Sequence, residues 1–257
     1  MGNIKDRTGE IRYNNFGSKM EIIKYNMNND IDVYFEEYNW IYYHASYGNF
    51  KKGSIECPYE KRFNKKGYYG EGKYKIKNNE GYTDYGVRWN SILKRCYSES
   101  YHNRFPTYID DSICEEWYNF QNFAKWYEEN YYEIEGEKMC LDKDILVKGN
   151  KIYSPQTCIF VPERVNILFT KRQNNRGDLP IGVTYHKRIK KFQSQCSNGK
   201  NNRICLGYYN TPEEAFQAYK SYKENLIKQV ADEYYFKGLI PKKLYDAMYR
   251  YEIEITD

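Results

Sequence analysis

The sequence predicts an α+β protein that contains several small domains. Its 257 residues exceed what one minimal domain needs, because a domain usually has about 100–200 residues. Apolar residues alternate with period two near the start of the chain and again in its last third, whereas helical spacing dominates between these regions. The patterns predict a small β-rich domain over residues 1–77, a central α+β domain over 78–172 and a third domain over 178–257. In the third domain we expect a three-stranded antiparallel sheet packed on a helix.

The β-rich domain begins with two strand-like runs. Lys19–Phe35 contains both runs, separated by the turn residues 26–30, and the apolar residues of the second run alternate with polar ones. Trp40–Ser46 predicts a further strand. Gly48–Gly72 contains Gly, Pro and Asn, so it predicts turns and little helix. The expected result is a small twisted sheet or barrel.

Two amphipathic helices are predicted in the central domain. Val87–Tyr97 and Trp117–Tyr131 both space their aromatic and aliphatic residues as a helix with one buried face does. Glu115 and Glu116 precede the second helix, where carboxylates interact favourably with the positive end of the helix dipole. We expect both apolar stripes to form core rather than a ligand platform.

A polar, basic linker over Lys171–Pro180 separates the third domain from the central one. Three short strands are predicted after it, over Ile181–Lys187, Phe192–Cys196 and Ile204–Tyr209. The turn Asn198–Lys200 joins the last two. These strands form the expected sheet.

The helix of the third domain has a clear start signal. Thr211 is a natural N-cap, Pro212 suits the first helical position, and Glu213 and Glu214 lie at the positive end of the dipole. One face of this helix should pack on the sheet, together with the side chain of Leu206. A further helix is expected within Leu239–Tyr251. The residues expected on the packed face are Ala215, Ala218, Tyr219, Tyr222 and Leu226.

Charge is distributed unevenly along the chain. The net formal charge is only +5, but residues 98–146 contain four Lys or Arg against twelve Asp or Glu, and residues 171–203 contain nine against one. An acidic middle followed by a basic stretch predicts a module for an anionic partner. The 31 tyrosines can fill cores or stack on bases, although an A/T-rich genome also explains their number.

The remaining global features concern the cellular setting. The seven cysteines are dispersed without a Cys-x-x-Cys pair, which argues against a zinc ribbon or a thioredoxin-like site. No apolar signal segment follows Met1–Arg7, and no window approaches the roughly 20 apolar residues that cross a bilayer. We therefore expect a reduced, cytoplasmic protein with buried free thiols and no membrane contact.

A recognisable series of features runs from Ile181 to Leu226. In chain order these are Gly182-Val183 with basic residues after it, a basic hairpin, Leu206-Gly207-Tyr208-Tyr209, and Thr211-Pro212-Glu213-Glu214-Ala215 leading to Ala218-Tyr219. The series resembles the three-strand-plus-helix DNA-binding domain of the plant Apetala/ethylene-response-factor (ERF) class, which also occurs in phage and bacterial homing endonucleases. The resemblance covers under a fifth of the chain.

This resemblance implies that the sheet lies in the major groove of double-stranded DNA. Lys and Arg neutralise phosphates, Gln forms paired hydrogen bonds with adenine, and aromatic rings contact thymine methyl groups or sugars. Lys, Tyr, Phe and Gln mostly replace the arginines and tryptophans of the plant domains, so binding is expected more strongly than base specificity. The residues that the resemblance places at DNA are Tyr185, Lys187, Arg188, Lys190, Phe192, Gln193, Gln195 and Arg203.

The segment Met139–Phe169 carries a second resemblance. It contains the run Leu141-Asp142-Lys143-Asp144 and, in a following loop, Gly149-Asn150-Lys151. It is similar to a diverged part of phage His-Asn-His (HNH) endonucleases, where this part precedes Apetala-type domains. An intact HNH motif places a strand histidine as general base, then a loop asparagine and a helix ligand, around one divalent metal ion.

The resemblance implies a degenerate HNH-like central domain. Lys143 occupies the position of the base, and no histidine lies between His102 and His186. An ordinary lysine is protonated at neutral pH and is a poor base, so we expect weak or absent nuclease activity. Two carboxylates can bind Mg²⁺, while an ion pair with the lysine is the alternative. The candidate catalytic residues are Asp142, Lys143, Asp144 and Asn150, and the candidate metal ligands are Asp142 and Asp144.

Three functional hypotheses follow. The preferred one is a phage or mobile-element DNA-binding protein with an inactive nuclease-like centre, acting in the cytoplasm of a host bacterial cell. The second is an active, divalent-metal-dependent homing endonuclease with an unusual carboxylate centre. The third is a phage anti-defence protein that binds a host defence protein, because an acidic middle segment suits a basic partner. The oligomeric state stays open.

Overall fold

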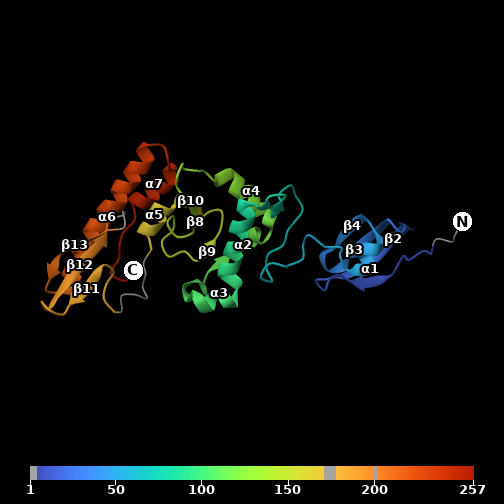
Figure 1. Ribbon diagram of the computed structural model, residues 1–257, viewed down its shortest axis with the longest axis horizontal. Coiled ribbons are helices and arrows are strands. Elements are labelled where there is room, and N and C mark those ends of the chain that lie inside the picture. The colour runs from blue at the N-terminus through green and yellow to red at the C-terminus, as the bar shows by residue number, and fades with distance from the viewer. Residues whose placement is uncertain (1–4, 171–177, 199–201) are drawn as a thin grey trace. The chain divides into compact units, whose positions relative to one another are not determined.

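The computed structural model describes residues 5–170, 178–198 and 202–257 (Figure 1). It contains helices and several small sheets, which confirms the α+β class. The chain forms two compact units, residues 1–129 and 130–257. Their border differs from the boundaries expected after residue 77 and at 172–178, and the three-domain division stays a prediction. Residues 171–177 of the expected linker lie outside the described residues.

Unit 1 begins with an antiparallel sheet in the strand order β1-β2-β3-β4. The predicted strands at 19–35 and 40–46 are confirmed. Alternate side chains of β2 and β3 are buried and form the core of this part, with Met20, Ile22, Val33 and Phe35 fully enclosed. The strands are β1 (Ile11–Tyr13), β2 (Lys19–Met27), β3 (Asp30–Phe35) and β4 (Trp40–Ala45).

A short helix follows β4, where the sequence predicts turns. Helix α1 (Tyr47–Lys52) begins because the Ser46 hydroxyl accepts a hydrogen bond from the backbone N–H of Asn49. It ends at Gly53, whose φ of 68° is left-handed. Phe50 on this helix is buried in the core of the sheet. Burial of one aromatic side chain thus stabilises a helix that local composition does not favour.

Aromatic side chains form the core of the rest of unit 1. The predicted first helix is α2 (Asp84–Tyr97) and is confirmed. The second starts later than expected, because residues 115–118 form a 3₁₀ turn and α4 spans Phe120–Asn130. The carbonyl of Tyr68 accepts from the N–H of Phe120, and the N–H of Tyr68 donates to Tyr118, so a strand-like bridge interrupts the helix. A tertiary contact therefore decides where this helix begins.

Several short elements complete unit 1. They are the 3₁₀ turns η1 (Glu36–Tyr38), η2 (Pro106–Tyr108) and η3 (Glu115–Tyr118), the strands β5 (Lys77–Asn78), β6 (Gly81–Tyr82) and β7 (Ser112–Ile113), and the helix α3 (Glu99–Arg104).

Unit 2 contains two small sheets and a long helix. Strands β8 (Met139–Asp142) and β10 (Ile159–Pro162) pair antiparallel, and α5 (Glu163–Leu168) follows them. The second sheet is antiparallel in the order β11-β12-β13, as predicted, and α6 packs along it (Figure 1). The remaining elements are β9 (Ile152–Tyr153), β11 (Val183–His186), β12 (Lys191–Ser197), β13 (Arg203–Tyr209), α6 (Pro212–Phe236) and α7 (Lys242–Tyr249).

Helix α6 starts as expected, but its buried face coincides only in part with the expected one. Thr211 and Glu214 form a reciprocal capping box, and Pro212 occupies the first turn. Ala218, Tyr222 and Leu226 are only half-buried, so the expected packed face was partly wrong. The 25-residue helix also reaches beyond the sheet, since Arg164 of α5 forms two hydrogen bonds with Glu233. The buried residues are Ala215, Phe216, Tyr219, Lys223, Ile227, Val230, Ala231 and Tyr234.

Leu206 is also half-buried rather than buried. Ser194 pairs with Gly207 and Gln195 pairs with Cys205, so Leu206 is the extra residue of a β-bulge. A bulged residue has no position opposite it on the partner strand, and the period-two pattern of the sequence does not reveal this.

Two further expectations concern thiols and membranes. All seven cysteines are free, and four are buried: Cys57, Cys96, Cys158 and Cys196. In the described part of the chain, no helix combines the length and the apolarity that a membrane span requires.

Candidate nucleic-acid interface

The hairpin between β11 and β12 presents a group of cations. Lys187, Arg188 and Lys190 lie in the turn, and Lys191 begins β12. All four side chains are exposed. Lys190 has a left-handed φ of 51°, which lets the four-residue turn close. Within the described ranges none of these cations forms an ion pair with a carboxylate, so their charge is available to a ligand.

The sheet has an inner face toward α6 and an outer face away from it. Val183, Ser194 and Cys196 are buried on the inner face. Because side chains alternate along a strand, Gln193 and Gln195 lie on the outer face. The Gln193 amide donates to the Cys205 thiol at 3.3 Å, which places Cys205 on that face too and lowers its pKa.

The eight predicted DNA contacts are divided between these faces. Tyr185 pairs with Phe192 across the strands, and their ring centroids are 5.1 Å apart. By alternation both rings lie on the same side as Val183, opposite to Gln193 and Gln195. Tyr185 is nevertheless 46% exposed. The structure therefore brings the two glutamines together and places the two aromatic residues on the other side.

Arg203 lies at the far end of the sheet from the basic hairpin. It pairs with Ser197, the last residue of β12, whereas Lys191 is the first. Seven strand residues span roughly 20 Å, so cations lie at both ends of the outer face. The turn between β12 and β13 includes residues 199–201, which are outside the described residues.

The outer face includes residues that the sequence alone did not single out. Tyr208 pairs with Gln193 and is 44% exposed. The ring of His186 stands edge-on to Tyr208 with centroids 5.7 Å apart. Thr184 is exposed beside them. Strict alternation from the buried Val183 could have identified Thr184 and His186. Tyr208 follows only from its pairing with Gln193 across the strands.

The candidate catalytic residues of the central segment do come together, in a loop that holds its own backbone. One Asp142 oxygen accepts from the N–H groups of Asp144 and Ile145, each at 2.8 Å. The Asn150 amide donates to the carbonyls of Lys143 and Ile152, each at 2.7 Å. Lys143 donates to the Asn150 carbonyl at 3.2 Å, and its ammonium lies 3.5 Å from Asp144. These side chains thus stabilise the loop.

Burial of this loop shifts the pKa of Asp142. Removal from water, and to a smaller extent the neighbouring charge of Asp144, together raise the pKa of Asp142 to about 6. Among the described residues, Asp142 and Asp144 belong to no group of three or more potential metal ligands. One Asp142 oxygen accepts two backbone hydrogen bonds, and the Asp144 carboxylate pairs with Lys143, so the loop already uses both carboxylates to hold itself together.

The end of the chain packs against the same loop. Lys148 donates to the Glu252 carbonyl and to the Asp257 carboxylate, at 2.8 and 2.9 Å. Its ammonium also lies 5.3 Å from the centre of the Tyr251 ring. Tyr251 has a pKa raised by burial and by the nearby carboxylates. The loop is therefore fixed from outside as well as by its own hydrogen bonds.

Comparisons of the chain with protein-family models, with curated proteins and with solved structures find no match.

Proposed function

We propose that unit 2 binds double-stranded DNA through the outer face of β11–β13 and that the Asp142 loop is a scaffold without efficient nuclease activity. The observation that carries this proposal is the layout of the outer face. Amide side chains lie at its centre, and at both ends lie cations that have no carboxylate partner among the described residues. In this proposal the protein is a phage or mobile-element DNA-binding protein of the bacterial cytoplasm.

The length of the β11–β13 sheet suits a position across the major groove of DNA. That groove is about 12 Å wide, and the seven residues of β12 span roughly 20 Å. Lys187 and Arg188 at one end and Arg203 at the other can therefore contact the backbones of the two strands. Phosphate contacts of this kind position a protein without reading sequence.

The centre of the face has groups that suit base edges. Gln193 and Gln195 can each form two hydrogen bonds with adenine, and Thr184 can contact a thymine methyl group. Tyr185 and Phe192, on the other side of the sheet, support the hairpin that presents the cations in this proposal.

Replacing Lys187 and Arg188 together by alanine should weaken binding to duplex DNA by about tenfold to hundredfold at 0.1 M salt. Each lost phosphate contact should also reduce the slope of log affinity against log salt by about 0.9. Fluorescence anisotropy of a labelled duplex over a series of salt concentrations measures both quantities.

The matched control for this test replaces Lys138 and Lys242 by alanine. Both are exposed cations of unit 2 outside the sheet, paired with Glu163 and Asp246. The control should keep the wild-type affinity and slope. An unchanged slope in the Lys187 and Arg188 variant would remove the hairpin from consideration as the contact.

Nuclease activity is expected to be absent or near background. Loss of a general base typically costs about 10²–10⁴ in rate, and the ammonium of Lys143 is held by Asn150 and Asp144. Plasmid and host DNA should stay intact with Mg²⁺ or Mn²⁺ present, equally for wild type, Asp142→Ala and Asp144→Ala. Robust cleavage that disappears in these variants would establish the endonuclease hypothesis instead.

A further inference from the structure

A second basic surface lies in unit 1, formed by the end of α1 and the segment that follows it. Residues 51–77 contain nine Lys or Arg and three Glu. Aromatic residues are interspersed with these cations, among them Tyr59, Phe63 and Tyr69. Clustered positive charge with aromatic rings between the cations suits a polyanion that also has flat apolar faces.

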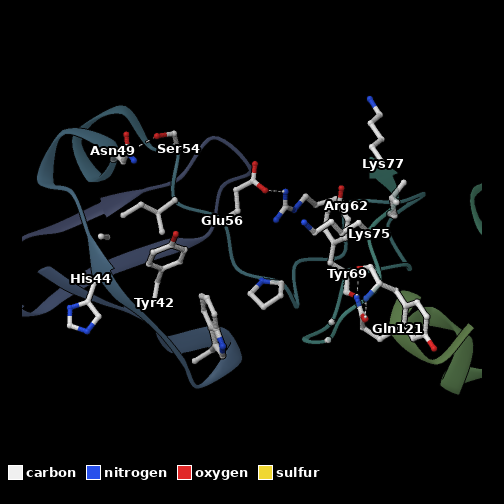
Figure 2. Close-up of a pocket in the computed structure, with 18 of the residues that line it drawn as sticks. Tyr42, His44, Asn49, Ser54, Glu56, Arg62, Tyr69, Lys75, Lys77 and Gln121 are labelled. Carbon is white, nitrogen blue, oxygen red and sulfur yellow. Dashed lines mark hydrogen bonds and ion pairs between the residues drawn. The ribbon is translucent and has the colours of Figure 1, made fainter. Parts of the chain in front are cut away.

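Part of this segment lines an open groove of about 720 Å³. Figure 2 shows Tyr42 and His44 on one side and Tyr69, Lys75 and Gln121 on the other. This volume lies within the range of about 300–1,000 Å³ that is usual for small-molecule sites. Trp40 and Tyr74 add two further aromatic rings to the lining.

Hydrogen bonds hold both walls in place. The Trp40 indole donates to Glu71 at 3.0 Å, and its ring is edge-on to Tyr42 with centroids 5.9 Å apart. On the other wall, Gln121 accepts from the Tyr74 N–H and donates to the Tyr74 carbonyl, both at 3.0 Å. A Cβ on Gly72 would lie 2.3 Å from the Gln121 oxygen, so a larger residue there would displace the Gln121 amide from its hydrogen bonds. The rings are therefore positioned before any ligand arrives.

The charge available to a ligand comes from Lys75 and Lys77. Both side chains are exposed, and among the described residues neither forms an ion pair. Lys77 lies over the Tyr82 ring at 4.3 Å, which leaves its charge uncompensated. Arg62 differs, because Glu56 and Glu60 pair with it. Two free cations beside fixed aromatic rings thus define the polar end of the groove.

We propose that this groove binds unpaired nucleotides of single-stranded DNA, with a base stacked on Tyr42 or Trp40 and adjacent phosphates on Lys75 and Lys77. Bases in a duplex have no open face to stack on a ring, whereas unpaired bases do. An acidic peptide would match the charge but would leave the aromatic walls unused. The site is separate from the sheet of unit 2 and does not depend on the function proposed for that sheet.

Tryptophan fluorescence reports on this groove selectively. All four tryptophans are in unit 1. Trp89 and Trp117 are 0% exposed and Trp126 is 8% exposed, so Trp40 is the one open to a ligand. Titration of the full-length protein with a ten-nucleotide oligo(dT) should give saturable quenching, and Trp40→Phe should remove most of it.

Three variants test which groups bind the nucleotides. Tyr42→Ala should weaken binding about fivefold or more, as loss of a stacked base does. Lys75→Glu with Lys77→Glu should weaken it at least about tenfold and reduce the salt slope by about 1.4, because each contact to single-stranded phosphate contributes about 0.7. The control Lys61→Glu with Lys94→Glu makes the same charge change outside the groove lining and should have a much smaller effect.

Other outcomes overturn the proposal. These are the absence of quenching by oligo(dT), quenching that persists in both groove variants, and equal quenching by a ten-residue oligoglutamate. The Lys187→Ala and Arg188→Ala variant should quench like wild type. Loss of the signal in that variant would place the binding on the sheet of unit 2 and reject the groove, whatever the result for duplex DNA.

Discussion

Replacing Trp117 by alanine is expected to lower the free energy of unfolding of unit 1 by about 3–5 kcal/mol, the usual cost of truncating a large core aromatic residue. Trp117 is fully buried, and its ring centroid lies 5.0 Å from Phe123 and 4.7 Å from Trp126. Its carbonyl accepts from the Trp89 indole at 2.7 Å. The alanine variant would leave a cavity between the turn at 115–118 and α4.

Tryptophan fluorescence during denaturant unfolding measures this loss, because the other three tryptophans are also in unit 1. Trp117→Phe is the matched control. The indole nitrogen of Trp117 is buried without a hydrogen-bond partner among the described residues, so phenylalanine keeps most of the ring and removes an unsatisfied donor. If Trp117→Ala and Trp117→Phe lowered the free energy of unfolding equally, packing of the Trp117 ring would not be the cause of the loss.

Gly182→Ala should destabilise the β11–β13 sheet by about 2–5 kcal/mol, which combines the cost of a left-handed backbone with that of overpacking. Gly182 has φ of 79°, and a Cβ there would lie 2.1 Å from the Tyr219 ring. Tyr219 is only 6% exposed. Its ring therefore cannot move aside without opening the interface between α6 and the sheet.

Hydrogen exchange of the β11–β13 amides measures this effect, together with the affinity for duplex DNA, which should fall with the stability of the sheet. Gly238→Ala is the control. Gly238 has a similar φ of 70°, but nothing lies within 4 Å of an added Cβ. It should cost only the backbone term of about 1–2 kcal/mol. Similar protection in both variants would show that contact with Tyr219 is unimportant.

Structural features that depend on a few neighbouring residues were predicted well. The turn between β2 and β3, the alternation of Ile31, Val33 and Phe35 in β3 and the start of α6 at Thr211 all agree with the structure. Each depends on the local φ/ψ preferences and hydrogen bonds of adjacent residues. The strands of the last sheet differ by one or two residues from the prediction, as fraying ends do.

Features that depend on distant partners were predicted less well. The start of α4 at Phe120 follows from the bridge to Tyr68, and the half-buried Leu206 follows from a bulge against Ser194 and Gln195. The actual buried face of α6 follows from its contacts with the sheet and with α7. No local pattern contains this information, because the energy comes from the partner surface.

The candidate site shows the same division. Composition and spacing alone placed the cations of the hairpin in an exposed turn and indicated that the Asp142 segment lacks a histidine. The tertiary structure was needed to place Gln193 and Gln195 on one face of the sheet and Tyr185 and Phe192 on the other. It was also needed to show that Asp142 and Asn150 stabilise a loop, and that a groove lies beside Lys75. Local sequence determines which residues turn, extend or coil, because those choices depend on near neighbours. Which side chains meet, and which remain open to a ligand, is decided by packing between segments that are far apart in the chain.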